Sequence, residues 1–370
     1  MSLADSPSPS PKGRGDRNPK KTTGMNTSAH HLSHANRWHI ILPAIVLLCA
    51  GCRRPVEETL TGPTMGTQFT VKVVRHPGAV ELAILEKEIQ AELDRVDALM
   101  STYRADSELS RFNAFDRTEW FPVSAATAEV VATAIDIGRL SGGAFDVTVG
   151  PLVNLWGFGP SKEPAERVPS PEEIEEAKSR TGLDHIEVRL SPPAVRKDLP
   201  GVSIDLSGVA KGFAVDQVAG LLERRGLENY MVEVGGEVRT KGQNLQGRPW
   251  QIGIESPVAG VRSLQRVVGL GDDAMATSGD YRNYFEADGV RYSHMIDPRT
   301  GRPIAHRLAS VTVLDRYCTR ADAWATALMV LGPEEGYALA EKEDLPVLLV
   351  IKSDAGFVEK ATPKFEKLLQ

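Results

Sequence analysis

The clearest pair of residues that could do chemistry lies in the segment TRADAWATALMVLG, residues 319–332. Asp322 and Thr326 are four residues apart, so on a helix their carboxylate and hydroxyl lie on one face. Two oxygen ligands with a single carboxylate suit Mg²⁺, which completes its coordination sphere with water and substrate phosphates. The alternative is structural, because an acidic side chain in a first turn complements the helix dipole and a threonine can bond to a preceding carbonyl.

A second candidate is DLSGVAKGFAVD, residues 205–216, where an extended run turns into an amphipathic one. Unpaired backbone N–H groups at a strand-to-helix turn suit a phosphate, and Lys211 adds a positive charge. The spacing from Gly208 to Lys211 is too compact for the P-loop pattern GxxxxGK[ST]. Gly208 and Gly212 could instead only permit close packing, with Lys211 in solvent.

A third candidate is SHMIDPRTG, residues 293–301, which places His294 near Asp297. An ordinary histidine has a pKa of about 6.5 and can move protons at neutral pH. We therefore take His294 as the candidate catalytic base, with Asp280 and Asp297 as the alternatives nearest in sequence. The Asp-Pro pair is also a good turn former, whatever the histidine does.

The composition of the whole chain limits the class of protein. The 370 residues carry a net charge of -6, with 41% hydrophobic and 25% charged residues. Such a length permits one large or two ordinary globular domains. A nucleic-acid-binding protein would normally carry a basic face, so we expect no nucleic-acid partner.

The sequence of the N-terminal region predicts a targeting signal. Residues 1–24 are rich in Pro, Ser, Gly and Lys, and we expect them to be disordered or not translated, with Met25 the true start. The eleven-residue apolar run 40–50 is too short for a helix across a bilayer of ~30 Å but fits a secretory signal.

The end of that run predicts a lipid anchor. Ala50 and Gly51 precede Cys52 as in the lipobox of bacterial lipoproteins. We expect residues 25–51 to be the signal peptide, Cys52 to carry the lipid, and the protein to face the periplasm from the inner membrane. A plain cleaved signal or an uncleaved anchor are the alternatives. After processing only Cys318 would remain, which excludes an internal disulfide.

The rest of the chain has to position these residues. Apolar spacing of three and four predicts a helix from Leu82 to Met100, and Ser124 is placed to cap a helix at 125–140. We expect residues 100–113 to be a loop and residues 141–160 to be irregular but packed. The charged run 161–173 is the best insertion site, with a possible insertion over 161–200.

Strands and helices alternate irregularly in the second half. Helices are predicted at 209–225 and 319–331. Strands are predicted at 64–74, 185–190, 202–206, 229–242, 250–257, 310–314 and 346–351, and a hairpin-like region at 276–304. Several of these runs form hairpin candidates, so the expected fold class is α+β with mainly antiparallel sheet.

Eight motifs follow one another from about Thr64 to Leu331: MGT, MSTYR, GAFDVTVGPL, IDLSGVAKGFAVD, VEVGGEV, ATSGDYRNYF, SHMIDPRTGRP and TRADAWATAL. In these motifs and their order, the chain resembles the ApbE family of FAD:protein FMN transferases. The resemblance implies an ApbE-like, T-fold-related architecture over residues 52–370. Eight ordered motifs are more specific than any one of them.

The resemblance also implies a set of site residues. FAD contacts are implied at Met65, Tyr103, Ala144, Phe145, Asp146, Asp205, Lys211 and Ile296. Metal ligands are implied at Asp322, at Thr326 and at the main-chain carbonyl of Gly208.

The implied reaction transfers FMN from FAD to a Thr or Ser hydroxyl of a target protein and releases AMP, with Mg²⁺ as cofactor. Exported domains of membrane redox subunits, of NADH:quinone reductase or Rnf type, are the implied acceptors. Two alternatives remain open at this point: a metal-dependent FAD pyrophosphatase that gives FMN and AMP, and a non-catalytic flavin-binding lipoprotein.

Overall fold

A computed structural model of the protein describes residues 54–160, 167–257, 264–280, 284–287 and 289–368. The predictions for residues 1–24, for the signal peptide and for Cys52 lie outside these residues. Within the described ranges, the helices are all too short or too polar to cross a membrane.

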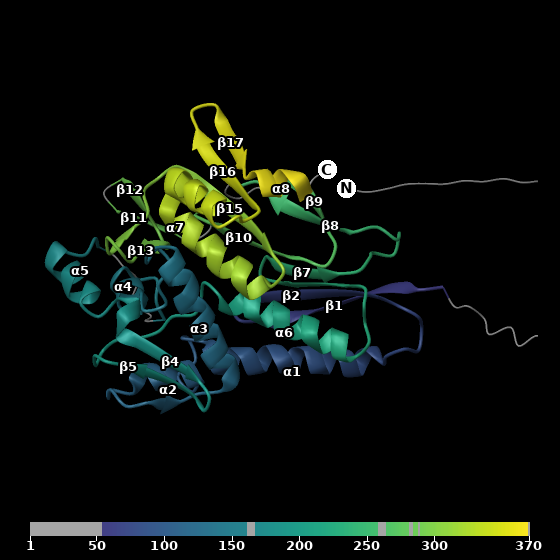
Figure 1. Ribbon diagram of the computed structural model, residues 1–370, viewed down its shortest axis with the longest axis horizontal. Helices are drawn as coiled ribbons and strands as arrows, with labels where there is room; N and C mark the ends of the chain where they lie inside the picture. The colour runs from purple at the N-terminus through teal and green to yellow at the C-terminus, as the bar shows by residue number, and fades with distance from the viewer. Residues whose placement is uncertain (1–53, 161–166, 258–263, 281–283, 288, 369–370) are drawn as a thin grey trace, which may run out of the picture. The chain divides into compact units, whose positions relative to one another are not determined.

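An eight-stranded sheet forms the centre of the fold, and each of its strand pairs is antiparallel (Figure 1). The prediction of α+β with mainly antiparallel sheet is therefore confirmed. In spatial order the strands are β1 (Val56–Thr64), β2 (Thr67–Arg75), β6 (Tyr230–Val234), β7 (Glu237–Lys241), β10 (Ala274–Gly279), β15 (Leu308–Asp315), β16 (Val347–Ser353) and β17 (Gly356–Ala361).

Four long helices build the main core against this sheet (Figure 1). They are α1 (Leu82–Met100), α3 (Ala125–Leu140), α6 (Ala210–Arg224) and α7 (Cys318–Lys342). Helix α7 contacts β10 and β15. Helix α6 contacts α1 on one side and α7 on the other. The residues just before α6 and those in the first turns of α7 are thereby brought together.

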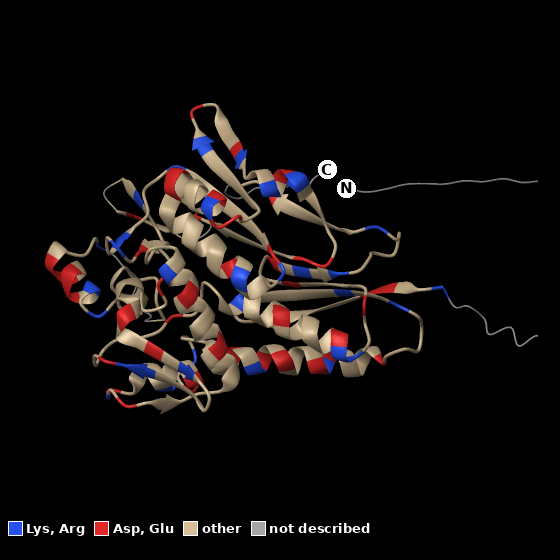
Figure 2. Cartoon of the chain, viewed as in Figure 1, with Lys and Arg blue, Asp and Glu red and all other residues tan. Residues whose placement is uncertain are grey.

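Helix α1 shows how the apolar spacing becomes structure. Leu85, Ile89, Leu93, Val96 and Met100 are all buried, as their spacing of three and four predicted. Charged residues of both signs lie along the rest of the helix (Figure 2). The helix begins and ends where the sequence predicted.

Shorter elements surround the core. The remaining helices are α2 (Glu108–Ala114), α4 (Gly150–Leu155), α5 (Pro171–Lys178), the 3₁₀ turn η1 (Leu183–His185) and α8 (Pro363–Leu368). The remaining strands are β3 (Phe121–Pro122), β4 (Ile186–Leu190), β5 (Pro193–Lys197), β8 (Trp250–Glu255), β9 (Leu264–Leu270), β11 (Tyr284–Ala287), β12 (Val290–Ser293), β13 (Ile296–Asp297) and β14 (Arg302–Pro303). Strands β3, β5 and β4 form one small sheet, and β8–β9, β11–β12 and β13–β14 form three hairpins.

The predicted strand at 202–206 is wrong. Val202, Ile204 and Leu206 are buried alternately, as in a strand. The backbone of Ile204, however, bonds to the side chain of Asn113, which accepts from its N–H and donates to its carbonyl. A side-chain amide thus satisfies the backbone where a neighbouring strand would, and no sheet forms there.

Three other segments also differ from prediction. The predicted loop at 100–113 contains α2, which Ser107 caps by accepting from the Ser110 N–H at 2.9 Å. The irregular segment at 141–160 contains the short helix α4. Helix α7 continues past Leu331 through a kink at Gly332.

The suggested insertion over 161–200 stays a prediction. Its described part is not loose, because α5, η1, β4 and β5 all fold there. Ile186 and Val195 belong to the main hydrophobic core. Any insertion in this region would therefore have become part of that core.

Candidate active site

A cleft of about 1050 Å³ opens beside the residues that join α6, α7 and β10. It gathers eleven of the twelve FAD, metal and base residues that the sequence predicted. They are Tyr103, Ala144, Phe145, Asp146, Asp205, Gly208, Lys211, His294, Ile296, Asp322 and Thr326. Segments that are up to about 220 residues apart in sequence are thus brought to one site.

Asp322 lies deep in this cleft, with only 3% of its surface exposed. Its Oδ2 accepts a hydrogen bond of 2.9 Å from the Gly212 N–H, in the first turn of α6. Burial raises the pKa of Asp322, although the ammonium of Lys211 and the Gly212 N–H both act to lower it. The carboxylate is therefore fixed in place and would gain from a nearby cation.

Thr326 and Gly208 meet on the same side of the cleft. A Cβ at Gly208 would lie 3.1 Å from Thr326 Oγ1 and 3.1 Å from the Phe145 ring, so a larger residue there would have to push these side chains aside. Ser278 Oγ of β10 lies 3.3 Å from Thr326 Oγ1. Three elements thus present oxygen atoms to one small region.

The donor set in this region is of one chemical kind. The described residues contain no cluster of three or more His, Cys, Asp or Glu that could hold a metal. One carboxylate, two hydroxyls and backbone carbonyls remain, which are hard oxygen ligands. Such a set fits a cation that takes part of its coordination from water or phosphate, as Mg²⁺ does.

Lys211 does not stand free in the cleft. Its Nζ lies 2.7 Å from Oε1 of Glu237, a residue with 2% of its surface exposed. Burial raises the pKa of Glu237 to about 7, against the lowering effect of Lys211. Burial lowers the pKa of Lys211, but Asp322 and Glu237 together raise it above its ordinary value. The lysine thus forms an ion pair with Glu237, and its positive charge also acts on the buried carboxylate of Asp322.

Sequence reasoning missed Glu237 as a site residue. It belongs to the motif VEVGGEV, which the family resemblance included, and it follows the turn between β6 and β7. The available signal was an acidic residue directly after a Gly-Gly turn that returns one strand beside another.

The glycine-rich loop after α3 forms another wall. The Phe145 N–H donates to Ser141 Oγ at 3.1 Å, and the carboxylate of Asp146 accepts from both the N–H and the hydroxyl of Thr148. Burial raises the pKa of Asp146, although the bonds from Thr148 act to lower it. The Asp205 N–H donates to Val147 O at 2.7 Å and ties this loop to the segment before α6.

Two of the predicted flavin contacts lie differently from the rest. Tyr103 is 70% exposed, and its pKa is raised by partial burial and by Asp205. It therefore offers an aromatic ring at the edge of the cleft. Met65 is not among the lining residues; it has a φ of 46° in the β1–β2 turn and packs against the main core.

His294 and Ile296 lie on the wall formed by residues 293–297, where a group of aromatic rings supports them. Phe158 meets His294 edge to face, with ring centroids 6.3 Å apart. Behind Phe158, Phe285 and Tyr292 stack at 5.1 Å, and Tyr292 stacks on Trp156 at 5.6 Å. Phe158 also lines the cleft and was not predicted as a site residue.

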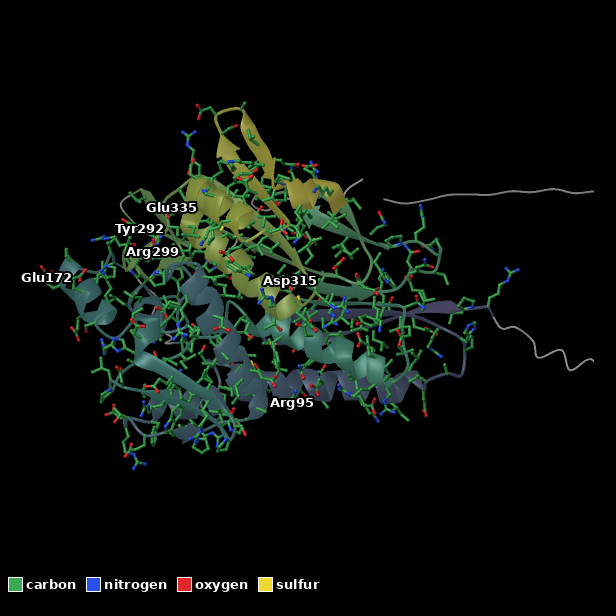
Figure 3. The ribbon with its side chains drawn as sticks, in the orientation of Figure 1. Arg95, Glu172, Tyr292, Arg299, Asp315 and Glu335 are labelled. Carbon is green, nitrogen blue, oxygen red and sulfur yellow. The ribbon has the colours of Figure 1, made fainter. Side chains whose placement is uncertain are left out.

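The alternative bases Asp280 and Asp297 do not line the cleft. Asp280 Oδ2 lies 2.6 Å from Lys352 Nζ, and Asp297 pairs with Arg299 at 3.0 Å. Arg299 also reaches Glu335 at 3.2 Å, in the region that Figure 3 labels. Both carboxylates are therefore engaged in ion pairs and do not line the cleft, although Asp297 lies between the lining residues Ile296 and Pro298.

Comparison with known proteins finds relatives that all belong to one family. The sequence matches the ApbE family over residues 65–349. It is 51% identical over 333 residues to the FAD:protein FMN transferase of Vibrio cholerae, and this match covers 90% of this chain and 98% of the relative. It is 48% identical over 339 residues to the enzyme of the same name from Haemophilus influenzae, covering 90% of this chain and 97% of the relative.

Solved structures agree with the sequence relatives. The flavin transferase ApbE from Vibrio cholerae has 50% identity and a TM-score of 0.78, and the match covers 85% of this chain and 99% of that one. The apo flavinyl transferase ApbE from Pseudomonas stutzeri has 42% identity and the same TM-score, with 85% and 98% covered. By sequence, fold and the residues gathered in its cleft, this chain belongs to the ApbE family.

Proposed function

We propose that the protein transfers FMN from FAD to a hydroxyl group of a target protein. The observation that carries this proposal is the single cleft in which Asp322, Thr326 and the segment 205–211 meet the loop 144–146. The relatives support the same activity, since they are named FAD:protein FMN transferases and the match covers nearly their whole length.

The reaction is a phosphoryl-type transfer. A Thr or Ser hydroxyl of the target forms a bond to the phosphorus on the riboflavin side of the FAD pyrophosphate. The bond from that phosphorus to the oxygen of AMP breaks, and AMP leaves. The protein has to hold the pyrophosphate, orient the hydroxyl and accept its proton.

Asp322, Thr326 and the carbonyl of Gly208 would hold Mg²⁺ in this proposal. The donor set supports it, because one carboxylate and neutral oxygens leave room for phosphate oxygens. When bound, the ion would neutralise charge on the pyrophosphate. The Gly212 N–H orients the Asp322 carboxylate for this role.

His294 is the proposed base. It lines the cleft, while Asp280 and Asp297 are paired elsewhere. Its ring is supported by Phe158. The imidazole of a histidine is a common acceptor of a hydroxyl proton in enzyme active sites.

The proposal includes a place in the cell. The apolar run 40–50 followed by Ala50-Gly51-Cys52 supports a lipid anchor on Cys52 at the periplasmic side of the inner membrane. Exported domains of membrane redox subunits would then be acceptors within reach.

The test is incubation with FAD, Mg²⁺ and a candidate acceptor domain, followed by the intact mass of the acceptor. We expect one FMN added per acceptor and AMP released in equal amount. A parallel reaction without acceptor measures hydrolysis of FAD alone. Equal AMP release in both reactions, with an unmodified acceptor, would identify a pyrophosphatase instead.

A further inference from the structure

The central sheet has a notch where it borders the cleft. Strand β7 pairs with β10 only at Ala274↔Arg239 and Met275↔Val238. Strand β7 begins at Glu237, directly after the turn from β6 at Gly235 and Gly236, whose φ values are 60° and 108°. Beyond Met275, the described residues give β10 a ladder partner on one side only, which is β15.

Two backbone bonds fix which groups of β10 face the notch. The Asp280 N–H donates to Ala309 O at 3.2 Å, toward β15, and the Thr240 N–H of β7 donates to Asp273 O at 2.9 Å. In an antiparallel ladder alternate residues bond to opposite neighbours. The backbone N–H and C=O groups of Ala276 and Ser278 therefore point to β15. Those of Thr277 and Gly279 point to the opposite side, where β7 pairs with the first residues of β10.

Thr277 and Gly279 thus present N–H and C=O groups to the cleft. Among the described residues, neither forms a backbone hydrogen bond on that side. Both residues line the cleft and are only half-buried. An unpaired strand edge of this kind is a template for another strand.

The notch lies beside the proposed chemistry. Ser278 sits between these two residues, and its Oγ is 3.3 Å from Thr326 Oγ1. Its side chain therefore points to the α7 face of the sheet, where the oxygen donors meet. A residue placed opposite Ser278 on an added strand would project its side chain to the same face.

We propose that the acceptor protein binds with an extended segment that fills this notch as an added strand, with the reacting hydroxyl residue opposite Ser278. The inference rests on the proposed transfer to a protein hydroxyl. A peptide fits because its N–H and C=O groups repeat every second residue, as those of Thr277 and Gly279 do.

The geometry gives the segment a fixed pattern of bonds. The residues directly before and after the acceptor threonine face Thr277 and Gly279 and exchange N–H and C=O bonds with them. The backbone of the threonine itself points away from β10. Recognition of the backbone would thus flank the reacting residue on both sides.

The first test is a scan of N-methylated peptides with the full-length enzyme. The probe is a nine-residue synthetic peptide around the threonine that this enzyme modifies in an acceptor domain, located by mass spectrometry. N-methylation before or after the threonine should lower kcat/KM by more than about 2-fold and up to about 12-fold, the usual effect of one lost hydrogen bond. N-methylation of the threonine itself is the matched control and should change it less than about 2-fold.

A flat scan, or equal losses at all three positions, would overturn the strand while leaving the proposed transfer intact. Failure of the proposed function would look different, since no acceptor or peptide would gain FMN at all.

The second test reads binding without transfer. Hydrogen exchange of the Thr277 and Gly279 amides is followed in the enzyme with a peptide whose threonine is replaced by valine. Both amides should become at least about tenfold better protected, while the Ser278 amide, already directed to β15, stays unchanged. Protection of Thr277 and Gly279 by FAD alone, with no further effect of the peptide, would assign the notch to the nucleotide and overturn the proposal.

Discussion

Asp322 combines a structural and a proposed chemical role in one side chain. Its Oδ2 accepts from the Gly212 N–H, and its burial raises its pKa, so the ionised carboxylate is costly in the metal-free protein. A bound cation would relieve that cost. The two roles can be separated by a substitution that keeps the shape of the side chain.

We predict that Asp322→Asn removes Mg²⁺ binding without destabilising the metal-free protein. The amide keeps an oxygen for the Gly212 N–H, and it removes a buried charge whose ionisation burial makes costly. Thermal unfolding with and without MgCl₂ checks this, since a ligand that binds only the native state raises the Tm. A wild-type Tm increase and wild-type transfer rate in the variant would contradict the metal assignment.

His294 gives the second prediction at this scale. If it is the base, His294→Ala should still bind FAD and Mg²⁺, while transfer falls about 10²–10⁴-fold, the usual contribution of a positioned acid or base. The pH–rate profile should also lose the ascending limb that deprotonation of a catalytic imidazole produces.

Steady-state rates at saturating FAD and FAD titrations provide the measurements. A variant that binds FAD poorly but transfers normally at saturation would make His294 a binding group. The base would then have to be sought elsewhere in the cleft, because Asp280 and Asp297 are paired outside it.

At the scale of elements, the α6–α7 contact positions the site. A Cβ at Gly212 would lie 2.4 Å from Cys318 O and 2.8 Å from Asp322 Cβ. Both atoms belong to α7, and Cys318 O is a backbone atom, so neither can move away without a shift of the helix. The glycine is therefore required by close approach of two helices.

We predict that Gly212→Ala destabilises the protein by ~1–3 kcal/mol, as overpacking does, and weakens Mg²⁺ binding. Gly220→Ala in the same helix is the matched control. A Cβ there would meet only the end of the Arg224 side chain at 3.3 Å, and alanine is the better helix former by ~1 kcal/mol. Urea unfolding of both variants checks this; equal stability would contradict the packing argument.

Prediction from sequence succeeded where one element carries its own pattern. Helix α1 and the Ser124-capped α3 were predicted at the residue because apolar spacing and capping are local. Segment 202–206 failed because Asn113, 91 residues away, satisfies the backbone of Ile204. No local pattern reports such a partner.

The site shows the same division. Asp322 and Thr326 were visible as a helical pair, and ordered motifs supplied the other predicted residues. Glu237 and Phe158 were missed because their roles depend on contacts with Lys211 and His294, which only the fold creates. The FAD contact at Met65 stays a prediction, since this residue packs against the main core and is not among the residues that line the cleft.

At the scale of the whole molecule, the proposed lipid anchor would decide which acceptors the site can meet. The described residues offer no membrane-spanning helix. The proposed attachment lies at Cys52, outside the described residues and four residues before β1 begins at Val56. The lipid would therefore hold the domain close to the membrane surface, where exported domains of membrane redox subunits would also lie.

We predict that Cys52→Ala abolishes membrane retention or leaves an unprocessed precursor, because the lipid and the cleavage both depend on the thiol at that position. Cys49→Ala is the matched control, since Cys49 lies in the apolar run and would leave with the signal. Fractionation and the intact mass of the purified protein give the measurement. Membrane retention of Cys52→Ala, together with a wild-type mass that includes no lipid, would contradict the anchor and favour an uncleaved signal. Wild-type behaviour of Cys49→Ala would show that the effect belongs to Cys52 rather than to loss of any thiol in the signal region.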